Sequence, residues 1–260
     1  MNELTRRQHE ILVQVIESHI ESAEPVGSRH LAESLQMPYS PATVRHEMGG
    51  LEELGYLLHM HTSSGRIPTD KGYRYYVDHG LAEEVFSAHP FTVCMNRVKG
   101  DEEENLESYA ERISFILAML SQEVGLIILG SHGDETEKEK ESFKILLKGT
   151  TSLFDKPEFK DTHKMRLLFE VLEEKHRLAK WISEKTQGDG VSVSIGRENK
   201  LESLWDCSVV SAKYTTGNRE GAIALVGPKR MRYARALPLV SKASDMIHQV
   251  IDWWERNQSL

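Results

Sequence analysis

The chain has 260 residues, of which 39% are hydrophobic and 28% are charged, and its formal net charge is -8. This composition is typical of a soluble protein with a real core, and the length allows about two domains. The sequence has no run of about 18 apolar residues and no apolar signal-peptide core near Met1, so we expect no membrane span and a cytoplasmic location. Cys94 and Cys207 lack metal-ligand spacing, which favours a reducing compartment.

Two helices are predicted near the N-terminus. The first spans about Thr5 to Ser22, with Thr5 and Gln8 at capping-box spacing and apolar residues at helical spacing from Ile11 to Ile20. The sequence from Glu24 to Gly27 ends this pattern. Ser28 is then placed to cap a short second helix over Arg29 to Leu35.

The third predicted helix has the features of one that enters a DNA major groove. Ser40 caps it, and Pro41 lies at the first helical position, where its missing N–H costs nothing. Val44, Met48 and Leu51 are spaced to face the core. The opposite face carries small residues and hydrogen-bond donors that suit contact with base edges: Ala42, Thr43, Arg45, His46 and Gly49.

Gly49 and Gly50 are unusual inside this helix, because each glycine costs about 1 kcal/mol relative to alanine. Two explanations stay open at this point. Either the backbone approaches DNA closely here, or the helix is frayed.

A strand, a polar loop and a fourth helix follow. Gly55 ends the third helix, residues 56–60 read as a strand, and residues 61–68 form a turn-rich wing with Arg66 at its tip. Thr69 caps a helix whose Tyr73, Tyr76 and Val77 should pack inward. Because this order is that of a winged helix-turn-helix, we assign residues 1–80 to a DNA-binding domain of that type.

The charge of these 80 residues does not by itself favour DNA, because they hold seven Lys and Arg against eleven Asp and Glu. Binding to phosphates must therefore depend on where the basic residues lie.

The rest of the chain is predicted to be a linker over residues 81–104 and an α+β domain over residues 105–260. We expect helices over 106–122 and 162–185. Strands are expected over 124–129, 143–147, 191–195, 208–214 and 221–226. A final helical region should follow Gly227 and Pro228, with an interruption at Pro238 and an end at Trp253 and Trp254.

A basic cluster follows Gly227 and consists of Lys229, Arg230, Arg232 and Arg235. It is either a solvated helix start, or a contact with DNA, with the first domain or with an anionic ligand. The sequence leaves these alternatives open.

No enzyme chemistry is indicated. The sequence has no phosphate-binding glycine loop with a lysine, no metal-spaced His and Cys set and no nucleophile elbow, so we expect no catalytic residue, no metal and no cofactor. Cys207 lies in an apolar strand and is expected in the core.

Several motifs resemble those of one known family. Glu24–Ser28, Ser40–Arg45, Leu51–Gly55 and His61–Asp78 closely resemble the N-terminal domain of the HrcA heat-inducible transcription repressors. The second half carries further motifs similar to that family: Pro157–Phe159, Ile195–Asn199, Cys207–Val210 with Tyr214, and Val226–Met231 with Tyr233.

The resemblance implies a dimeric repressor that binds an inverted-repeat operator (CIRCE) upstream of chaperone genes and is kept active by the chaperonin. It also implies a GAF-like second domain. This chain departs from the family pattern in three ways: His46 replaces the usual asparagine, Gly49 and Gly50 replace better helix formers, and only a short charged loop separates Gly130 from Phe143, where the family carries its dimerising insert. We therefore expect a shortened form that dimerises through helix 106–122 or through the C-terminal helix with Trp253 and Trp254, or that dimerises weakly.

The candidate site follows from the motifs and the resemblance together. Ser40, Thr43, Arg45 and His46 are expected at bases or nearby phosphates, next to Pro41 and Ala42, and Arg66 in the minor groove or on a phosphate. The backbone contacts are expected from Ser28, Arg29, Thr62, Ser63, Lys71 and Arg74. The alternative function is a winged-helix regulator whose GAF-like domain senses a small molecule and which controls a different operator.

Overall fold

The computed structural model of the chain describes residues 4–34, 38–60, 65–81, 89–97, 105–130, 143–186, 190–216 and 219–258. The chain divides into two compact units. The first contains residues 1–84 together with Lys229–Tyr233, and the second contains residues 85–228 and 234–260.

Helices form most of the first unit. They are α1 (Arg6–Ser22), α2 (Ser28–Ser34), α3 (Pro41–Glu53) and α4 (Asp70–Tyr75), which continues as a π-helical turn over Tyr76–Gly80. Two short strands, β1 (Leu57–His59) and β2 (Arg66–Pro68), lie between α3 and α4. The four helices and the strand β1 agree with the sequence prediction, whereas β2 lies in residues 61–68, which were predicted as a loop.

The caps predicted at Thr5 and Ser40 begin their helices, whereas Ser28, predicted to cap the second helix, is itself the first residue of α2. The hydroxyl of Thr5 accepts a hydrogen bond from the backbone N–H of Gln8, and the side-chain oxygen of Gln8 accepts one from the backbone N–H of Thr5. The capping box of α1 is therefore confirmed. The hydroxyl of Ser40 accepts from the backbone of Thr43 at the start of α3. The apolar faces of these two helices are buried as predicted: Ile11, Leu12, Val15, Ile16 and Ile20 on α1, and Val44, Met48 and Leu51 on α3.

The small sheet of the first unit has a contribution from the turn between α1 and α2. Strands β1 and β2 pair antiparallel, with Leu57 opposite Pro68 and His59 opposite Arg66. The backbone of Val26 bonds to Arg66 in both directions, each bond 2.9 Å long. A Cβ at position 65 would overlap the backbone of Val26, so this approach requires Gly65.

The second unit is built on one antiparallel sheet of five strands in the order β4-β3-β7-β6-β5. The strands are β3 (Val124–Gly130), β4 (Phe143–Lys148), β5 (Val191–Ile195), β6 (Cys207–Thr216) and β7 (Arg219–Pro228). All five overlap the strands predicted from the sequence. The unit is therefore α+β, as expected.

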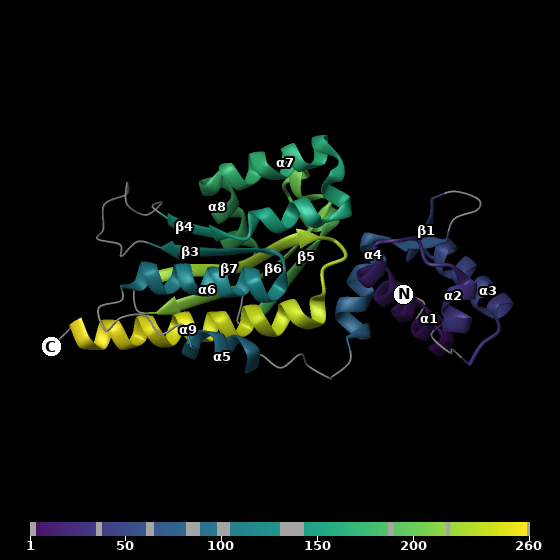
Figure 1. Ribbon diagram of the computed structural model, residues 1–260, viewed down its shortest axis with the longest axis horizontal. Helices are drawn as coiled ribbons and strands as arrows, with labels where there is room; N and C mark the ends of the chain where they lie inside the picture. Colours follow the sequence, from purple (N-terminus) through teal and green to yellow (C-terminus); the bar gives the residue numbers. More distant parts are fainter. Residues whose placement is uncertain are drawn as a thin grey trace. The chain divides into compact units, whose positions relative to one another are not determined.

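Helices cover both faces of this sheet (Figure 1). On one side lie α7 (Thr162–Glu173) and α8 (Lys175–Lys185), which share a buried core with the strands. On the other side lie α6 (Leu106–Ser121) and α9 (Tyr233–Gln258). Cys207 is 1% exposed and belongs to the core that the strands share with α7 and α8, which confirms its predicted place.

Three predictions about helices differ from the structure. The single helix expected over 162–185 is two helices, because the backbone at Glu174 leaves the helical region (φ -73°, ψ 56°). The expected interruption at Pro238 is absent, and α9 runs through it. Pro238 lies in the second turn of α9, where only the carbonyl of Ala234 loses a helical partner. Residues 81–104, expected as a linker, include α5 (His89–Arg97), in which Phe91 is fully buried.

A buried ion pair joins two loops of the second unit. The ammonium of Lys156 lies 2.8 Å from the carboxylate of Glu123, and their side chains are 14% and 5% exposed. Gly227 lies beside this pair, where a Cβ would overlap the carboxylate. The charge of each partner is therefore compensated inside the protein.

Within the described ranges, the structure contains no helix with the length and apolar character needed to cross a membrane.

Replacing Gly65 by alanine tests the approach between Gly65 and Val26. We expect the added Cβ to push the two backbones apart and to destabilise the first unit by about 1–3 kcal/mol. Amide hydrogen exchange of β1 and β2 would measure the change. The control is Gly49→Ala, the same substitution in open space, which should leave that exchange no faster. Equal exchange in the wild-type chain and in Gly65→Ala would contradict the interpretation.

Candidate nucleic-acid interface

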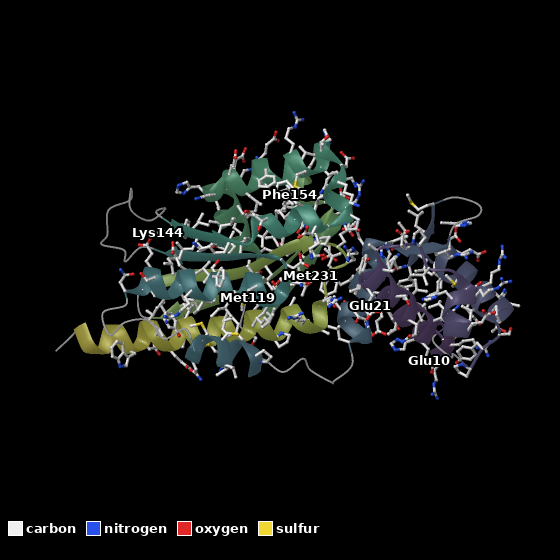
Figure 2. All side chains as sticks on the ribbon, in the orientation of Figure 1. Glu10, Glu21, Met119, Lys144, Phe154 and Met231 are labelled. Atoms are coloured by element: carbon white, nitrogen blue, oxygen red, sulfur yellow. The ribbon has the colours of Figure 1, made fainter. Side chains whose placement is uncertain are left out.

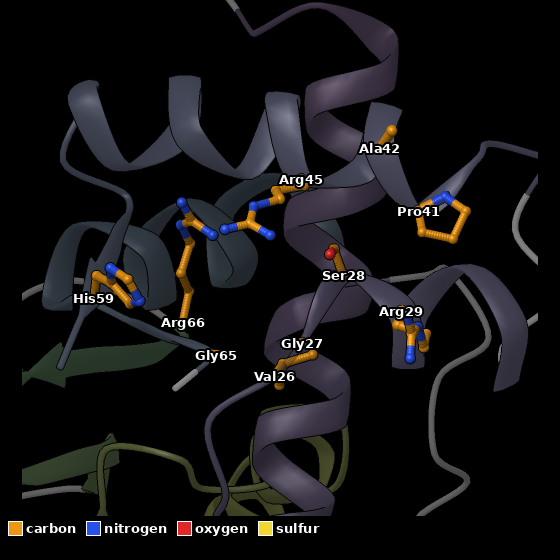
Figure 3. Close-up of a pocket in the computed structure, with 10 residues that line it drawn as sticks. All are labelled: Val26, Gly27, Ser28, Arg29, Pro41, Ala42, Arg45, His59, Gly65 and Arg66. Atoms are coloured by element: carbon orange, nitrogen blue, oxygen red, sulfur yellow. The ribbon is translucent and has the colours of Figure 1, made fainter. Parts of the chain in front are cut away.

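A groove in the first unit collects much of the predicted site. Its volume is about 510 Å³, and it is formed by the turn before α2, the start of α3, strand β1 and the start of β2 (Figure 3). The lining residues are Val26, Gly27, Ser28, Arg29, Pro41, Ala42, Arg45, His59, Gly65 and Arg66.

Helix α3 is fixed against α1 by polar contacts at its start. Tyr39, just before the cap of α3, donates its hydroxyl to Glu10 of α1 at 2.6 Å. Arg7 of α1 lies 3.3 Å from Glu47 of α3 and stacks over the ring of Tyr39, 5.3 Å from its centroid. These contacts set the direction in which α3 presents its exposed face.

The same contacts shift two pKa values. The hydroxyl of Tyr39 and then the guanidinium of Arg6 hold the pKa of Glu10 below its ordinary value. In return, the hydrogen bond to Glu10 raises the pKa of Tyr39. Glu10 is therefore ionised and Tyr39 is protonated at neutral pH, which keeps the bond intact.

Two arginines extend into the groove from different elements (Figure 3). Arg45 comes from α3 and is exposed, and within the described residues it has no ion-pair partner. Arg66 comes from β2, its side chain is only 16% exposed, and its Nε lies 2.9 Å from the carboxylate of Glu52. A third arginine that lines the groove, Arg29, lies 3.8 Å from the carboxylate of Glu33. Of the three positive charges, that of Arg45 is therefore uncompensated among the described residues, and the other two are partly compensated.

The prediction that Arg66 lies at the tip of the wing is wrong. Arg66 lies in β2, at the base of the loop, where its backbone pairs with Val26 and its side chain reaches α3. The sequence placed it in a turn because the glycine before it is a turn signal. In the structure that glycine instead allows a close approach between backbones.

The remaining predicted residues lie outside the groove. Ser40, Thr43 and His46 lie on the first turns of α3, with Ser40 and His46 exposed. Lys71 donates to the carbonyl of Leu54 at 2.7 Å and stacks over Tyr56, and Arg74 pairs with Asp78 at 3.2 Å. Thr62 and Ser63 lie outside the described residues.

Two residues of the site were missed by the sequence reading. His59 lines the groove because alternate residues of β1 face opposite sides, and that alternation was available in the sequence. Glu52 is placed by α3 to meet Arg66, and no local pattern indicates a contact between residues 14 positions apart.

The groove suits an anionic ligand. Guanidinium groups bind phosphates through paired N–H donors, and the exposed Arg29 lies at the same groove. The exposed face of α3 next to it offers small and polar side chains. Among the described residues, no group of three or more His, Cys, Asp or Glu side chains could hold a metal ion.

A solved crystal structure shares the fold of the whole chain. It is that of a hypothetical protein at 2.2 Å resolution, with a TM-score of 0.80 and 22% sequence identity, and it covers 96% of this chain and 99% of that chain. The chain is therefore an α+β protein of a fold already seen in a crystal.

The family is defined by the sequence. Residues 85–237 match the model described as the HrcA protein C terminal domain, so the chain belongs to the HrcA family. The heat-inducible transcription repressor HrcA of Shouchella clausii is 30% identical over 342 aligned residues, covering 97% of this chain and 100% of the relative. The protein of the same name from Oceanobacillus iheyensis is 30% identical over 343 residues, covering 98% and 100%.

These relatives are longer than this chain. An alignment of 342 residues that covers all of the relative exceeds the 260 residues present here, so the relative holds residues that this chain lacks. The predicted shortening is confirmed. Its expected position, between Gly130 and Phe143, falls on residues 131–142, outside the described residues.

Gly49 offers a test of close approach by a ligand. Helix α3 continues through Gly49 and Gly50 to Glu53, so the frayed-helix explanation is wrong. A Cβ at Gly49 meets no atom within 4 Å, and nothing within the described protein requires a glycine there. We expect Gly49→Ala to stabilise α3 by about 1 kcal/mol and to weaken DNA binding by about tenfold.

Thermal unfolding and DNA titration of the same sample would measure both effects. His176→Ala is the binding control, since it adds helix propensity at an exposed position of α8 in the second unit, outside the groove, and should leave the affinity unchanged. Unchanged affinity in Gly49→Ala would show that DNA does not approach the helix backbone at this point.

Proposed function

We propose that this protein is a transcription repressor that binds double-stranded DNA in a sequence-specific way through the groove of its first unit. The observation that carries the proposal is the convergence of Arg45 and Arg66 on one groove beside the exposed face of α3. Relatives that align over nearly the whole chain are named heat-inducible transcription repressors, which supports the same function.

The first unit acts in this proposal as a winged helix-turn-helix domain. Helices α2 and α3 form the helix-turn-helix, and strands β1 and β2 with the loop between them form the wing. Helix α3 enters the major groove, with Ala42, Thr43, Arg45 and His46 toward the bases. The second unit, with helices on both faces of its antiparallel sheet, acts as a GAF-like regulatory and dimerisation domain.

Contacts with the DNA backbone come from the rim of the groove. Ser28 and Arg29 at the start of α2 bind phosphate, and Arg66 reaches a second phosphate at the base of the wing. Lys71 and Arg74 are weaker candidates than the sequence indicated, because both bind groups within the first unit and neither lines the groove. Because the operator is DNA, the protein acts in the cytoplasm.

The operator is an inverted repeat upstream of chaperone genes, as in the resemblance, and the chaperonin keeps the repressor active. The operator sequence itself is not expected to be the usual one, because His46 replaces the usual asparagine. An asparagine binds adenine through two hydrogen bonds, whereas a neutral imidazole offers one donor and one acceptor in another geometry. The half-site read by this chain therefore differs from the usual one at the base opposite His46.

Arg45→Ala tests the proposed readout. We expect the loss of about 1–3 kcal/mol of affinity for a DNA sequence selected by the wild-type protein from a random library, with weaker discrimination against mutated sites. Competition titrations at fixed salt would measure both. The matched control is Arg166→Ala on α7, which removes an exposed arginine of the second unit paired with Glu170 and should leave affinity unchanged. An equal loss on selected and random DNA would show that Arg45 binds phosphate only.

Dimerisation through α6 completes the proposal, because an inverted repeat is bound by a two-fold symmetric protein. Phe115 and Met119 lie one turn apart on α6 and are 54% and 48% exposed. On α9, Trp253 is also 59% exposed, but the side chain of Trp254 lies outside the description. The pair on α6 therefore has the stronger support.

Replacing Phe115 and Met119 by lysine should convert the dimer to a monomer, because two charges would then be buried in the interface. Light scattering after size-exclusion chromatography would measure the mass. Phe154→Lys is the control: Phe154 is 63% exposed, and Figure 2 shows it well apart from Met119. A double variant that remains a dimer would rule out α6 as the interface.

A further inference from the structure

The segment Lys229–Tyr233 belongs to the first unit although its neighbours in sequence belong to the second. It begins directly after β7, which ends at Pro228, and ends at Tyr233, the first residue of α9. The chain therefore leaves the second unit for five residues and then returns to it. This segment includes part of the basic cluster whose role the sequence left open.

Two cations of the segment bind helix ends of the first unit. Arg230 donates from Nη1 to the carbonyl of Ile20 at 3.0 Å, in the last turn of α1. Carbonyls in the last turn of a helix lack a helical partner and carry partial negative charge. An arginine there donates the missing hydrogen bond and compensates that charge. The ammonium of Lys229 lies 2.8 Å from Asp70, the first residue of α4.

Apolar burial supports these polar contacts. Tyr233 is 0% and Met231 is 1% exposed. The ring of Tyr233 lies 6.3 Å from that of Tyr73 on α4, and its hydroxyl donates to the carbonyl of Lys229 at 2.6 Å. Tyr233 thus completes the packing around Tyr73 and holds the segment in a closed turn. Arg232, by contrast, is exposed.

The ends of this segment are fixed by the most central parts of the second unit. Strand β7 pairs with both β3 and β6 along its length, and α9 buries Leu239, Val240 and Ala243. While the second unit is folded, the five residues are held at short range. When it unfolds, their ordering costs the full conformational entropy of a free chain.

We propose that Lys229–Tyr233 is a clamp that makes the stability of the first unit depend on the folded state of the second. Resting on the proposed function, this gives the repressor a route to release DNA on heating: the second unit melts, the clamp loses its fixed ends, and α1 and α4 lose their partners. DNA binding then ends before any change within the groove itself.

The test uses the full-length chain and two separate signals over a temperature series. All four tryptophans, Trp181, Trp205, Trp253 and Trp254, lie in the second unit, so their fluorescence follows that unit alone. Amide hydrogen exchange of peptides from α1 and α4 follows the first unit. Neither signal requires DNA.

In the wild-type chain we expect both transitions at the same temperature. In the double variant Lys229→Met, Arg230→Met, exchange in α1 and α4 should accelerate several degrees below the tryptophan transition. Arg232→Met removes an exposed cation from the same segment and should behave as wild type. The proposal is overturned if the double variant opens no such gap, or if wild-type α1 and α4 stay protected after the tryptophan transition.

A parallel measurement separates this proposal from the proposed function. The temperature at which the selected DNA dissociates should follow the exchange of α1 and α4 in each variant. If the wild-type chain binds no DNA sequence specifically, the proposed function fails, while the exchange result still decides whether the clamp exists. If DNA binds but dissociates at a temperature unrelated to that exchange, the clamp has no part in release.

Discussion

The backbone pairing of Val26 with Arg66 is the contact on which the groove depends. Two hydrogen bonds of 2.9 Å attach the turn between α1 and α2 to the first residue of β2. Without them, the start of α2 and the base of the wing would have no fixed relation. With them, Ser28 and Arg29 share a wall with Arg66, and α3 closes the other side. The side chain of Arg66 then reaches Glu52, so one residue joins the helix turn, the strand and α3.

Local chemistry explains which parts of this arrangement the sequence could predict. The caps at Thr5, Ser40 and Thr69 depend on residues three positions away, and the buried faces follow from helical spacing. The place of Arg66 depends on a residue 40 positions earlier, and no local pattern carries that information. The helices that carry the candidate site and most of its lining residues were therefore predicted, whereas the strand position of Arg66 and the part played by His59 were not. Its actual partners, such as Glu52 for Arg66 and Leu54 for Lys71, needed the fold.

In the second unit, too, the features set by local sequence were predicted and those set by the fold were not. Its strands are apolar runs that the sequence marks clearly, and all five were placed. The break at Glu174 has no glycine or proline to signal it, and the apolar spacing continues on both sides. Pro238 gave the opposite error, since α9 continues through the proline although it lacks the N–H that would bond to the carbonyl of Ala234. The basic cluster after β7 shows most clearly what the sequence could not predict. Arg230 binds a helix end, whereas Arg232, two positions further on, is exposed, although their sequence neighbours are nearly the same.

The acidic balance around the groove has a consequence for how the protein finds its target. Non-specific affinity for DNA comes almost entirely from cations that neutralise phosphates, and genomic DNA is an enormous excess of competing sites. The first 80 residues hold more carboxylates than basic residues, and three of their seven Lys and Arg side chains line one groove. In the proposed function, such a charge balance leaves little affinity for the wrong DNA, so selectivity comes as much from poor binding elsewhere as from tight binding at the operator. Under the same proposal, each groove arginine carries a large share of the affinity.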